Sequence, residues 1–315
     1  MHPDFSSVLV KQLGRTCICL FLLALTAHAQ SELNLKGAID TRVHASPDNV
    51  TRAIDADDLA RLLKNSGMRG FVLVNHWEAT DALAYMVRKE VPGIEVFGGI
   101  EMDQSAGGIN VEAVKRMTMM KGGWGKVVWM PTFDAVTFTD WVKKDGKGRA
   151  YSTTLVPMSK EGHLLPSVIE VIDFVAQHPD LLLETGHNSA EEGLMVVHEA
   201  HERGVKHIVV TGAMDPVVNM TIAQMQQAAQ EGAYIEFAYS NAFGPEPERT
   251  MSEFADAIRK IGPKSCILST NFVDYPNHPQ ALLEFMEGLH KEGISVADIN
   301  LMAKTNPALA LGLKP

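Results

Sequence analysis

The stretch Ala38-Ile39-Asp40-Thr41-Arg42-Val43-His44 sets the expected fold of this 315-residue chain. An apolar start is followed by polar side chains at alternate positions, and residues two apart in a strand share one face. The alternation predicts that Asp40, Arg42 and His44 point the same way at the C-terminal end of a first strand. Because parallel barrels build their active sites at this end, we expect the shared face to carry chemistry.

Seven further apolar runs follow, separated by longer amphipathic segments. We expect strands at 37–44, 70–76, 94–101, 126–132, 181–187, 207–212, 233–239 and 266–271. Eight strand-then-helix units predict an α/β protein, a single (β/α)8 TIM-type barrel with an extra C-terminal helix. The alternative is an open doubly wound sheet, which would need a glycine-rich phosphate loop after the first strand, and the sequence has none there.

The longest connection between a predicted strand and its helix spans 133–165. Asp145-Gly146 within it has the composition of a hairpin turn. Long loops on this face of a barrel are commonly lids or substrate walls. The alternative is a solvated hairpin without a function.

The first 29 residues have the pattern of a cleaved signal peptide. Lys11 and Arg15 precede a short apolar run, and Ala27-His28-Ala29 is a small-x-small cleavage motif. The alternative is a membrane anchor, for which the apolar run is short. We therefore expect a signal peptide at 1–29, a barrel domain at 30–315, and a secreted or periplasmic mature chain.

The charge balance bears on the class of partner. The chain has 28 basic and 38 acidic residues, and an acidic chain without a basic run argues against nucleic acid or an anionic membrane. We expect a small-molecule substrate and make no prediction of the oligomeric state. Cys266 is the only cysteine after the expected cleavage point, so the mature chain cannot form an internal disulfide.

Polar side chains gather where the predicted strands end. His44, His76 and His187 end the first, second and fifth strands. Imidazole binds zinc or iron well, so one divalent metal ion (Zn, Fe or Mn) is a candidate cofactor, and no nucleotide cofactor is expected. At the ends of other predicted strands, we expect contacts to the substrate from Glu101, Thr132, Glu236 and Asn271. Asp274, in the loop after the eighth strand, is a candidate catalytic residue.

Several stretches resemble an uncharacterised family of amidohydrolase-like barrels, of the metal-dependent hydrolase type. They are Asp40-Thr41-Arg42-Val43-His44-Ala45-Ser46-Pro47-Asp48, Asn75-His76-Trp77-Glu78-Ala79-Thr80, Val96-Phe97-Gly98-Gly99-Ile100, Val128-Trp129-Met130-Pro131-Thr132, Thr185-Gly186-His187-Asn188-Ser189 and Asn306-Pro307-Ala308-Leu309-Ala310-Leu311-Gly312-Leu313. The resemblance covers nearly the whole mature chain and names no substrate.

The resemblance implies D-x-H-x-H on the first strand, a lysine two residues before the second-strand histidine, T-G-H on the fifth strand, T-H on the sixth and S-x-D on the eighth. The chain matches at Asp40, His44, His76 and His187. It departs at Arg42, Val74, Gly212 and Asn271. Protonated arginine, valine and glycine offer no lone pair to a metal, and neutral asparagine cannot act as a general base. A binuclear metal centre is therefore not expected, and a retained metal would rely on His44, His76 and His187.

Arg42 has two interpretations. Paired with Asp40 or Asp274, its guanidinium would replace the charge of the metal. Unpaired, its planar fork would bind a carboxylate or phosphate of the substrate.

These observations predict an exported amidohydrolase-like hydrolase acting on a small, anionic, carboxylated substrate. With a metal, Asp274 or Asp40 would be the general base; without one, His187 or His44 would be the acid/base and Arg42 would orient the anion. The alternative is a non-catalytic barrel, a pseudoenzyme, that binds a small anion or a partner. The four substitutions favour the alternative, and the retained histidines favour the enzyme.

Overall fold

The computed structural model describes residues 33–145, 154–243, 247–271 and 280–315. The expected signal peptide and Asp274 lie outside the described residues. The barrel unit is Asn34–Pro315.

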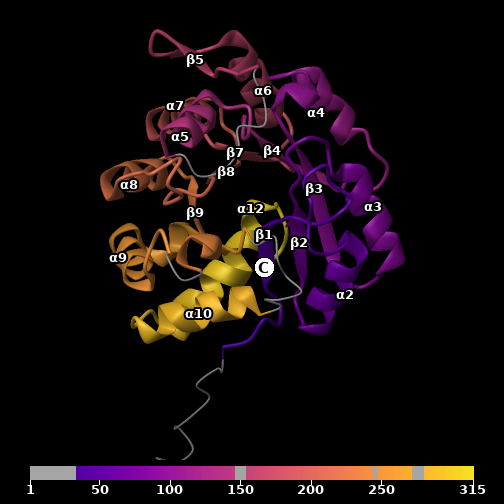
Figure 1. The fold of residues 1–315 in the computed structure, drawn as a ribbon, viewed down its shortest axis with the longest axis vertical. Helices are drawn as coiled ribbons and strands as arrows, with labels where there is room; N and C mark the ends of the chain where they lie inside the picture. Colours follow the sequence, from indigo (N-terminus) through magenta and orange to yellow (C-terminus); the bar gives the residue numbers. More distant parts are fainter. Residues whose placement is uncertain (1–32, 146–153, 244–246, 272–279) are drawn as a thin grey trace, which may run out of the picture. The chain divides into compact units, whose positions relative to one another are not determined.

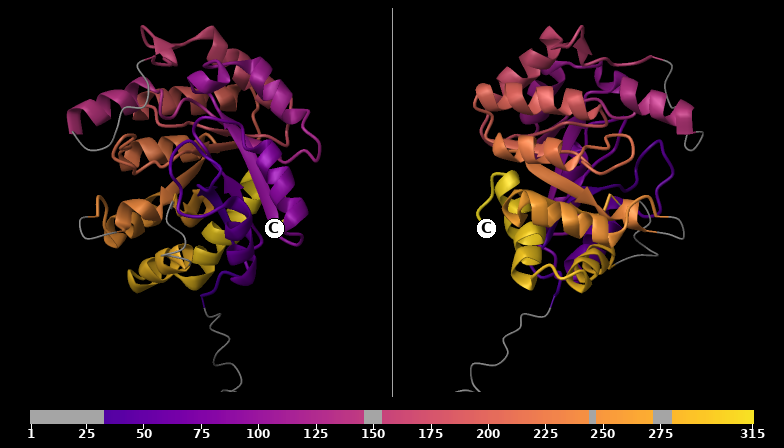
Figure 2. Two further views of the ribbon diagram at one scale, coloured as in Figure 1. Left: turned by 45° about the vertical axis from the view of Figure 1, so that its right-hand side comes forward. Right: turned by 90° about the vertical axis from the view of Figure 1, so that its left-hand side faces the viewer.

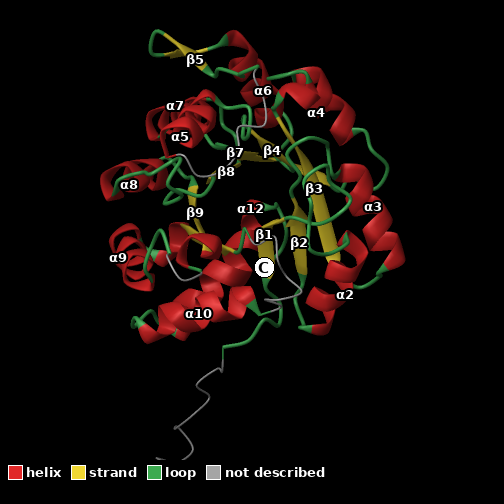
Figure 3. Ribbon diagram, in the orientation of Figure 1, coloured by secondary structure: helices red, strands yellow, loops and turns green. Residues whose placement is uncertain are grey.

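Eight parallel strands form a nearly closed barrel, as predicted, in the order β1-β2-β3-β4-β7-β8-β9-β10 (Figures 1 and 3). Their bounds are β1 Ile39–Val43, β2 Gly70–Leu73, β3 Glu95–Glu101, β4 Gly125–Trp129, β7 Leu182–Glu184, β8 His207–Val210, β9 Tyr234–Ala238 and β10 Cys266–Ser269. Each strand follows its neighbour in chain order, which is the arrangement that excludes the doubly wound alternative.

Helices surround the strands (Figure 2). They are α2 Ala56–Asn65, α3 Asp81–Glu90, α4 Val111–Thr118, α5 Val136–Asp145, α6 Pro166–Ala176, α7 Ala190–Glu202, α8 Ile222–Gln230, α9 Met251–Ile261, α10 Ala281–Lys291, α11 Val296–Asn300 and α12 Asn306–Ala310. Short helical turns lie at η1 Gln104–Ala106, η2 Tyr239–Ala242, η3 Pro263–Ser265 and η4 Leu301–Thr305. The side chain of Ser189 caps α7 by accepting from Glu192 N at 3.2 Å, which is the start that the sequence pattern indicates. No helix among the described residues is long and apolar enough to cross a bilayer.

In the long connection after β4, Gly146 and the residues that follow the hairpin turn expected at Asp145-Gly146 lie outside the described residues. Helix α5 runs through Val136–Asp145, so the residues before the expected turn are helical. A two-stranded hairpin lies later, where β5 (Ser159–Lys160) pairs with β6 (His163–Leu164). Glu161 and Gly162 have positive φ angles of 52° and 78° in its turn, which is the backbone that such tight turns need.

The barrel interior is apolar toward one end and polar toward the other. Val72, Val74, Phe97 and Trp129 belong to a buried cluster that includes Ala308, Ala310 and Leu311 from α12 and the residue after it. This C-terminal segment covers the bottom of the barrel, at the N-terminal ends of the strands. The polar side chains named from the sequence are therefore left at the opposite end, as expected for a barrel of this type.

Candidate active site

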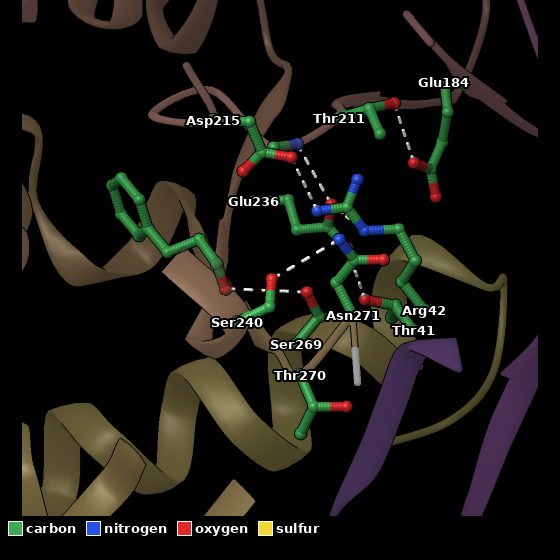
Figure 4. Close-up of polar contacts among 12 residues, drawn as sticks. Thr41, Arg42, Glu184, Thr211, Asp215, Glu236, Ser240, Ser269, Thr270 and Asn271 are labelled. Carbon is green, nitrogen blue, oxygen red and sulfur yellow. Dashed lines mark hydrogen bonds and ion pairs between the residues drawn. The ribbon is translucent and has the colours of Figure 1, made fainter. Parts of the chain in front are cut away.

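Arg42 lies buried between carboxylates from two neighbouring parts of the barrel. Its Nη2 is 3.1 Å from Asp215 Oδ2, after β8, and its Nε is 3.3 Å from Glu236 Oε2, in β9 (Figure 4). Burial alone lowers the pKa of Arg42, but the charges of Glu236 and Asp215 outweigh it and raise the pKa above its ordinary value. The guanidinium is therefore a permanent positive charge inside the barrel.

The carboxyl groups around Arg42 are themselves held in place. Glu236 accepts hydrogen bonds from Thr41 Oγ1 at 3.1 Å and from Gly212 N at 3.0 Å. Asp215 accepts from Asn241 Nδ2 at 2.5 Å, and Glu184 accepts from Thr211 Oγ1 at 2.9 Å. Burial and then the charge of Glu236 raise the pKa of Glu184 well above its ordinary value, which favours its neutral form. The guanidinium thus pairs with two carboxylates, Asp215 and Glu236, while burial favours the neutral form of the nearby Glu184.

This network corresponds to the ion-pair interpretation of Arg42, with different partners from those expected. Asp215 and Glu236 pair with it, and Asp40 does not. Glu236, expected to contact the substrate, is one of the two partners. Two of the three guanidinium nitrogens thus already face carboxylates, whereas Nη1 is buried without a hydrogen-bond partner among the described residues.

Asp40 does not share a face with Arg42, contrary to the expected alternation. Three steps along β1, from Asp40 to Val43, match two steps along β2, so β1 contains a bulge that breaks the two-residue period. Asp40 Oδ2 accepts from Thr270 Oγ1 at 2.6 Å and Oδ1 accepts from Thr270 N at 3.1 Å. Figure 4 shows Thr270 pointing away from the Arg42 guanidinium. Together with the bond from Asn271 N to Arg42 O at 3.0 Å, Asp40 joins the first strand to the last.

Gly212 marks the point where the sixth-strand histidine is expected. Its φ is +48°, and a Cβ built there would lie 2.1 Å from Oδ2 of Asp215. The carboxylate of Asp215 therefore fills the space that a side chain at 212 would need. The same oxygen binds Arg42, so the glycine and the ion pair depend on one another.

The three predicted histidines do converge. The ring centroids of His44 and His76 are 5.1 Å apart, and those of His76 and His187 are 5.9 Å apart. Phe133, directly after Thr132, stacks on His76 with centroids 3.6 Å apart. Burial is the largest cause that lowers the pKa of each histidine well below its ordinary value, so all three are neutral at neutral pH.

His44 is oriented by Asn271. Its Nε2 is 3.1 Å from Oδ1 of Asn271, which can only accept, so Nε2 carries the hydrogen. The left-handed φ of 47° at Asn271 turns its side chain back toward the first strand. Nδ1 of His44 consequently carries a lone pair and no hydrogen. This atom is buried and has no hydrogen-bond partner among the described residues.

His76 is oriented by a compact carboxyl network. Its Nδ1 is 2.7 Å from Glu101 Oε2 and 3.0 Å from Thr132 Oγ1. Thr132 Oγ1 also lies 2.5 Å from Glu101 Oε2 and 2.6 Å from Asp103 Oδ2. One hydroxyl hydrogen can serve only one of these carboxyl groups, so the other must donate its own proton.

Glu101 is the carboxyl that keeps the proton. Asp103 accepts from the backbone N–H groups of Thr132, Phe133 and Asp134 at 2.9, 3.1 and 3.2 Å, which favours its anion. Burial raises the pKa of Glu101 to about 8, and burial followed by the charge of Glu101 raises the pKa of Asp103 to about 7. Glu101 and Thr132, expected to contact substrate, instead position His76.

The fit of these residues to a metal ion is poor. The buried group of the described chain whose donor atoms all lie within 4.8 Å of one another is His76, Glu101 and Asp103, not the three histidines. Both oxygens of Asp103 already accept backbone N–H groups, and Thr132 bridges it to Glu101. A metal at this group would have to break the bonds that hold the loop after β4, and a cation near Arg42 would meet its positive charge.

Four contributors were not given a role from the sequence. The sequence places Asp103 and Asp215 just after the ends of predicted strands, but the residues that they contact depend on the conformation of the loops. Glu184 sits in an apolar run, as a lone carboxylate in a buried strand, which was an available signal. Arg52 lies nine residues after the end of β1, in a loop where an arginine is usually solvated, yet its side chain is only 5% exposed.

The comparisons with solved structures report the same fold. An organophosphorus hydrolase from Deinococcus radiodurans is 14% identical, covering 90% of this chain and 100% of that one, with a TM-score of 0.59. A putative 2-pyrone-4,6-dicarboxylic acid hydrolase from Pseudomonas putida is 13% identical, covering 89% and 98%, with a TM-score of 0.53. A structure described as organophosphate hydrolysis engineered from a weak promiscuous lactonase template is 14% identical, covering 85% and 94%, with a TM-score of 0.56. No curated protein sequence matches the chain.

Such low identities establish the barrel and not the activity. They show that the chain shares the barrel fold of solved structures that are named as hydrolases. The model of one protein family matches residues 37–236, which run from β1 into β9 and include most of the site. The chain therefore belongs to a family of unknown function (DUF6282).

Proposed function

We propose that this chain is an amidohydrolase-like hydrolase that cleaves an ester or lactone bond in a small, carboxylated substrate. The observation that carries the proposal is a pair of buried imidazole nitrogens, Nδ1 of His44 and Nδ1 of His187, without a hydrogen-bond partner in the described part of the chain. Unpaired buried polar atoms cost free energy, and they are expected where they act on a ligand.

His44 is the general base in this proposal. Asn271 fixes the hydrogen on Nε2, and burial, followed by the charge of Arg52, keeps the ring neutral by lowering its pKa. Nδ1 then takes a proton from the water that attacks the carbonyl carbon and returns it to the leaving oxygen. His76, held by Glu101, and His187 line the same cluster and orient the carbonyl group.

No step of the proposal passes through a metal. Arg42, Val74 and Gly212 stand where the family resemblance implies metal-site residues, and none of them can donate a lone pair. The positive charge that a metal would supply is already present as the Arg42 guanidinium, balanced by Asp215 and Glu236. Elemental analysis of the purified protein after loading with zinc, iron or manganese tests this part separately.

The names of two fold neighbours guide the choice of test substrates. One is called an organophosphorus hydrolase, and the other is named for a dicarboxylic acid. These names describe those two proteins only. They are a reason to include esters, lactones and phosphotriesters among the first substrates tested on this chain.

A non-catalytic barrel is the second candidate, and two observations favour it. The Arg42 charge is sealed in ion pairs, and Phe133 covers one face of His76 at a centroid distance of 3.6 Å. A decayed site that only binds a small anion would keep the histidine cluster for packing.

One assay decides between the two candidates. The purified chain is tested on a panel of carboxylated lactones, aryl esters and phosphotriesters, with and without prior removal of metal ions. We expect turnover of a lactone or ester and a loss of about 100-fold or more in kcat/KM for His44→Gln and for His187→Gln. The matched control is His198→Gln, because His198 is 61% exposed on α7. Absence of turnover across the panel, or equal rates in His44→Gln and wild type, would favour the non-catalytic barrel.

We also propose that the chain is exported after removal of residues 1–29 and acts on a small molecule, with neither nucleic acid nor membrane as a partner. The small-x-small motif and the acidic composition support this proposal. Cell fractionation and N-terminal sequencing of the mature protein test it. An uncleaved chain in the membrane fraction would contradict it.

A further inference from the structure

The loop between β1 and α2 is fixed against the histidine cluster. It begins two residues after His44, and Ser46 closes its base through the bonds Ser46 N to Ile54 O and Ala56 N to Ser46 O, both 2.8 Å. Asn75, the residue before His76, donates from Nδ2 to Pro47 O at 2.9 Å. The loop is thereby attached to the ends of both strands that carry these histidines.

This loop buries a second guanidinium. The side chains of Arg52 and Asp48 are 5% and 0% exposed. Nε of Arg52 is 2.6 Å and Nη2 is 2.5 Å from one and the same oxygen, Oδ2 of Asp48. Asp48 therefore occupies the side edge of the guanidinium, between Nε and Nη2.

The end edge of the same guanidinium, formed by Nη1 and Nη2, is different. Neither nitrogen has a well-formed hydrogen bond to any residue that the structure describes, and Nη2 is buried. Two parallel N–H groups at this edge match the two oxygens of a carboxylate. Arg42 differs in its partners: its Nε and Nη2 face two separate carboxylates, although its Nη1 is also buried without a hydrogen-bond partner among the described residues.

The charge of Arg52 reaches the histidines. After burial, it is the largest contribution that lowers the pKa of His44 and of His76. The proximity agrees with the attachment of the loop to Asn75. The loop that carries Arg52 is therefore attached next to the histidine cluster, at the same end of the barrel.

We propose that the Nη1–Nη2 edge of Arg52 binds a carboxylate group of the ligand and sets it beside His44 and His76. The inference deepens the proposed function and rests on it for the identity of the bond that is cleaved, although carboxylate binding itself does not require catalysis. Asp48 already balances part of the Arg52 charge, so a singly charged carboxylate suits this edge better than doubly charged phosphate.

Calorimetric titration of the full mature chain tests the proposal with three probes: glutarate, its neutral diamide and inorganic phosphate. We expect glutarate to bind, and the diamide and phosphate to bind at least about tenfold more weakly. Arg52→Gln should weaken glutarate binding by about tenfold or more. Asp48→Asn should tighten it, because the side edge of Arg52 then loses its competing carboxylate.

Arg61→Gln is the matched control. Arg61 forms the same i,i+4 type of ion pair, with Asp57 at 2.7 Å, but its side chain is 42% exposed on α2. It should leave glutarate binding unchanged. If Arg52→Gln fails to fold because Asp48 is left unpaired, the double variant Asp48→Asn/Arg52→Gln removes both charges and serves in its place.

Several outcomes overturn the proposal. They are wild-type affinity for glutarate in Arg52→Gln or in the double variant, equal binding of the diamide or of phosphate, and no binding of glutarate by the wild type. The proposed hydrolase activity is tested separately. If glutarate binding depends on Arg52 but no substrate is turned over, only the proposed hydrolase activity is contradicted. If substrate is turned over and the Arg52→Gln substitution has no effect on it, only the proposed role of Arg52 is contradicted.

Discussion

A Cβ on Gly212 would lie 2.1 Å from Oδ2 of Asp215, the oxygen that binds Arg42. The missing side chain at 212 and the buried ion pair are therefore one structural change. A histidine placed at 212 would displace Asp215 and leave the Arg42 charge short of a partner, so this substitution alone should not rebuild a metal site.

Substituting Gly212 tests this relationship. Gly212→Ala should lower the free energy of unfolding by about 3–5 kcal/mol, because it combines a left-handed φ with loss of a buried ion pair. The control is Gly204→Ala, where φ is +79° and nothing lies within 4 Å of the added Cβ. It should lose only about 1 kcal/mol. Equal losses in urea denaturation would mean that Asp215 moves aside without penalty.

Removing Arg42 should unmask its partners. Arg42→Met leaves Asp215 and Glu236 buried without a counter-charge and should destabilise the fold by about 3–5 kcal/mol. The triple variant Arg42→Met/Asp215→Asn/Glu236→Gln removes all three charges and should be more stable than Arg42→Met alone. Both thermal and urea unfolding should rank the triple variant above Arg42→Met in stability. If the losses in free energy of unfolding from the three substitutions simply add, the three groups act independently.

Glu101 should give the protein a specific pH dependence. Its pKa in the folded chain is raised to about 8 by burial, from an ordinary value of 4.5. The folded state therefore holds a proton that the unfolded state releases, so this contribution to stability is complete below about pH 4.5 and is lost as the pH rises toward 8. The histidines, with lowered pKa values, act in the opposite direction and stabilise the fold as the pH rises toward about 6.5.

Glu101→Gln isolates the glutamate contribution, because the amide mimics the protonated carboxyl and can still donate to Thr132. We expect the difference in unfolding free energy between wild type and variant to change steadily between pH 5 and pH 8, by about 1.4 kcal/mol for each unit of pKa shift at most. Urea titrations across that range measure it. A constant difference would place the proton elsewhere in the network.

Asp40 should matter for closing the barrel. Thr270→Val removes the donor to Asp40 Oδ2 and should cost about 1.5–3 kcal/mol, as expected for a hydrogen bond to a buried charged group. A double-mutant cycle with Asp40→Asn should show strong coupling, because the two side chains share this bond. A normal kcat in Thr270→Val at a temperature where it is folded would agree with a structural role. A kcat that falls in both single variants without any loss of stability would restore the catalytic role first expected for Asp40.

The sequence was sufficient for the order of the strands and for the convergence of His44, His76 and His187. Both follow from local patterns, since alternating apolar runs specify strands and a barrel brings all strand ends to one face. The bulge in β1 was not predictable, because one extra residue between Asp40 and Val43 leaves the hydrophobic pattern almost unchanged while it reverses the face of Asp40.

The partners of the histidines were also beyond the sequence. Whether Thr132 meets a substrate or bridges Glu101 and Asp103 depends on a loop conformation fixed by three backbone N–H groups. Arg52 illustrates the same limit, since a loop arginine is usually solvated. Its burial comes from the attachment of the loop to Asn75.

The Arg42 guanidinium has a consequence for how the protein matures. Because the guanidinium is part of the polypeptide, every newly synthesised chain contains one such cation. Asp215 and Glu236 can therefore find their counter-charge during folding itself, whatever the ionic content of the compartment, and no loading step has to follow. The core of this barrel should consequently form at a rate that is indifferent to trace-element supply.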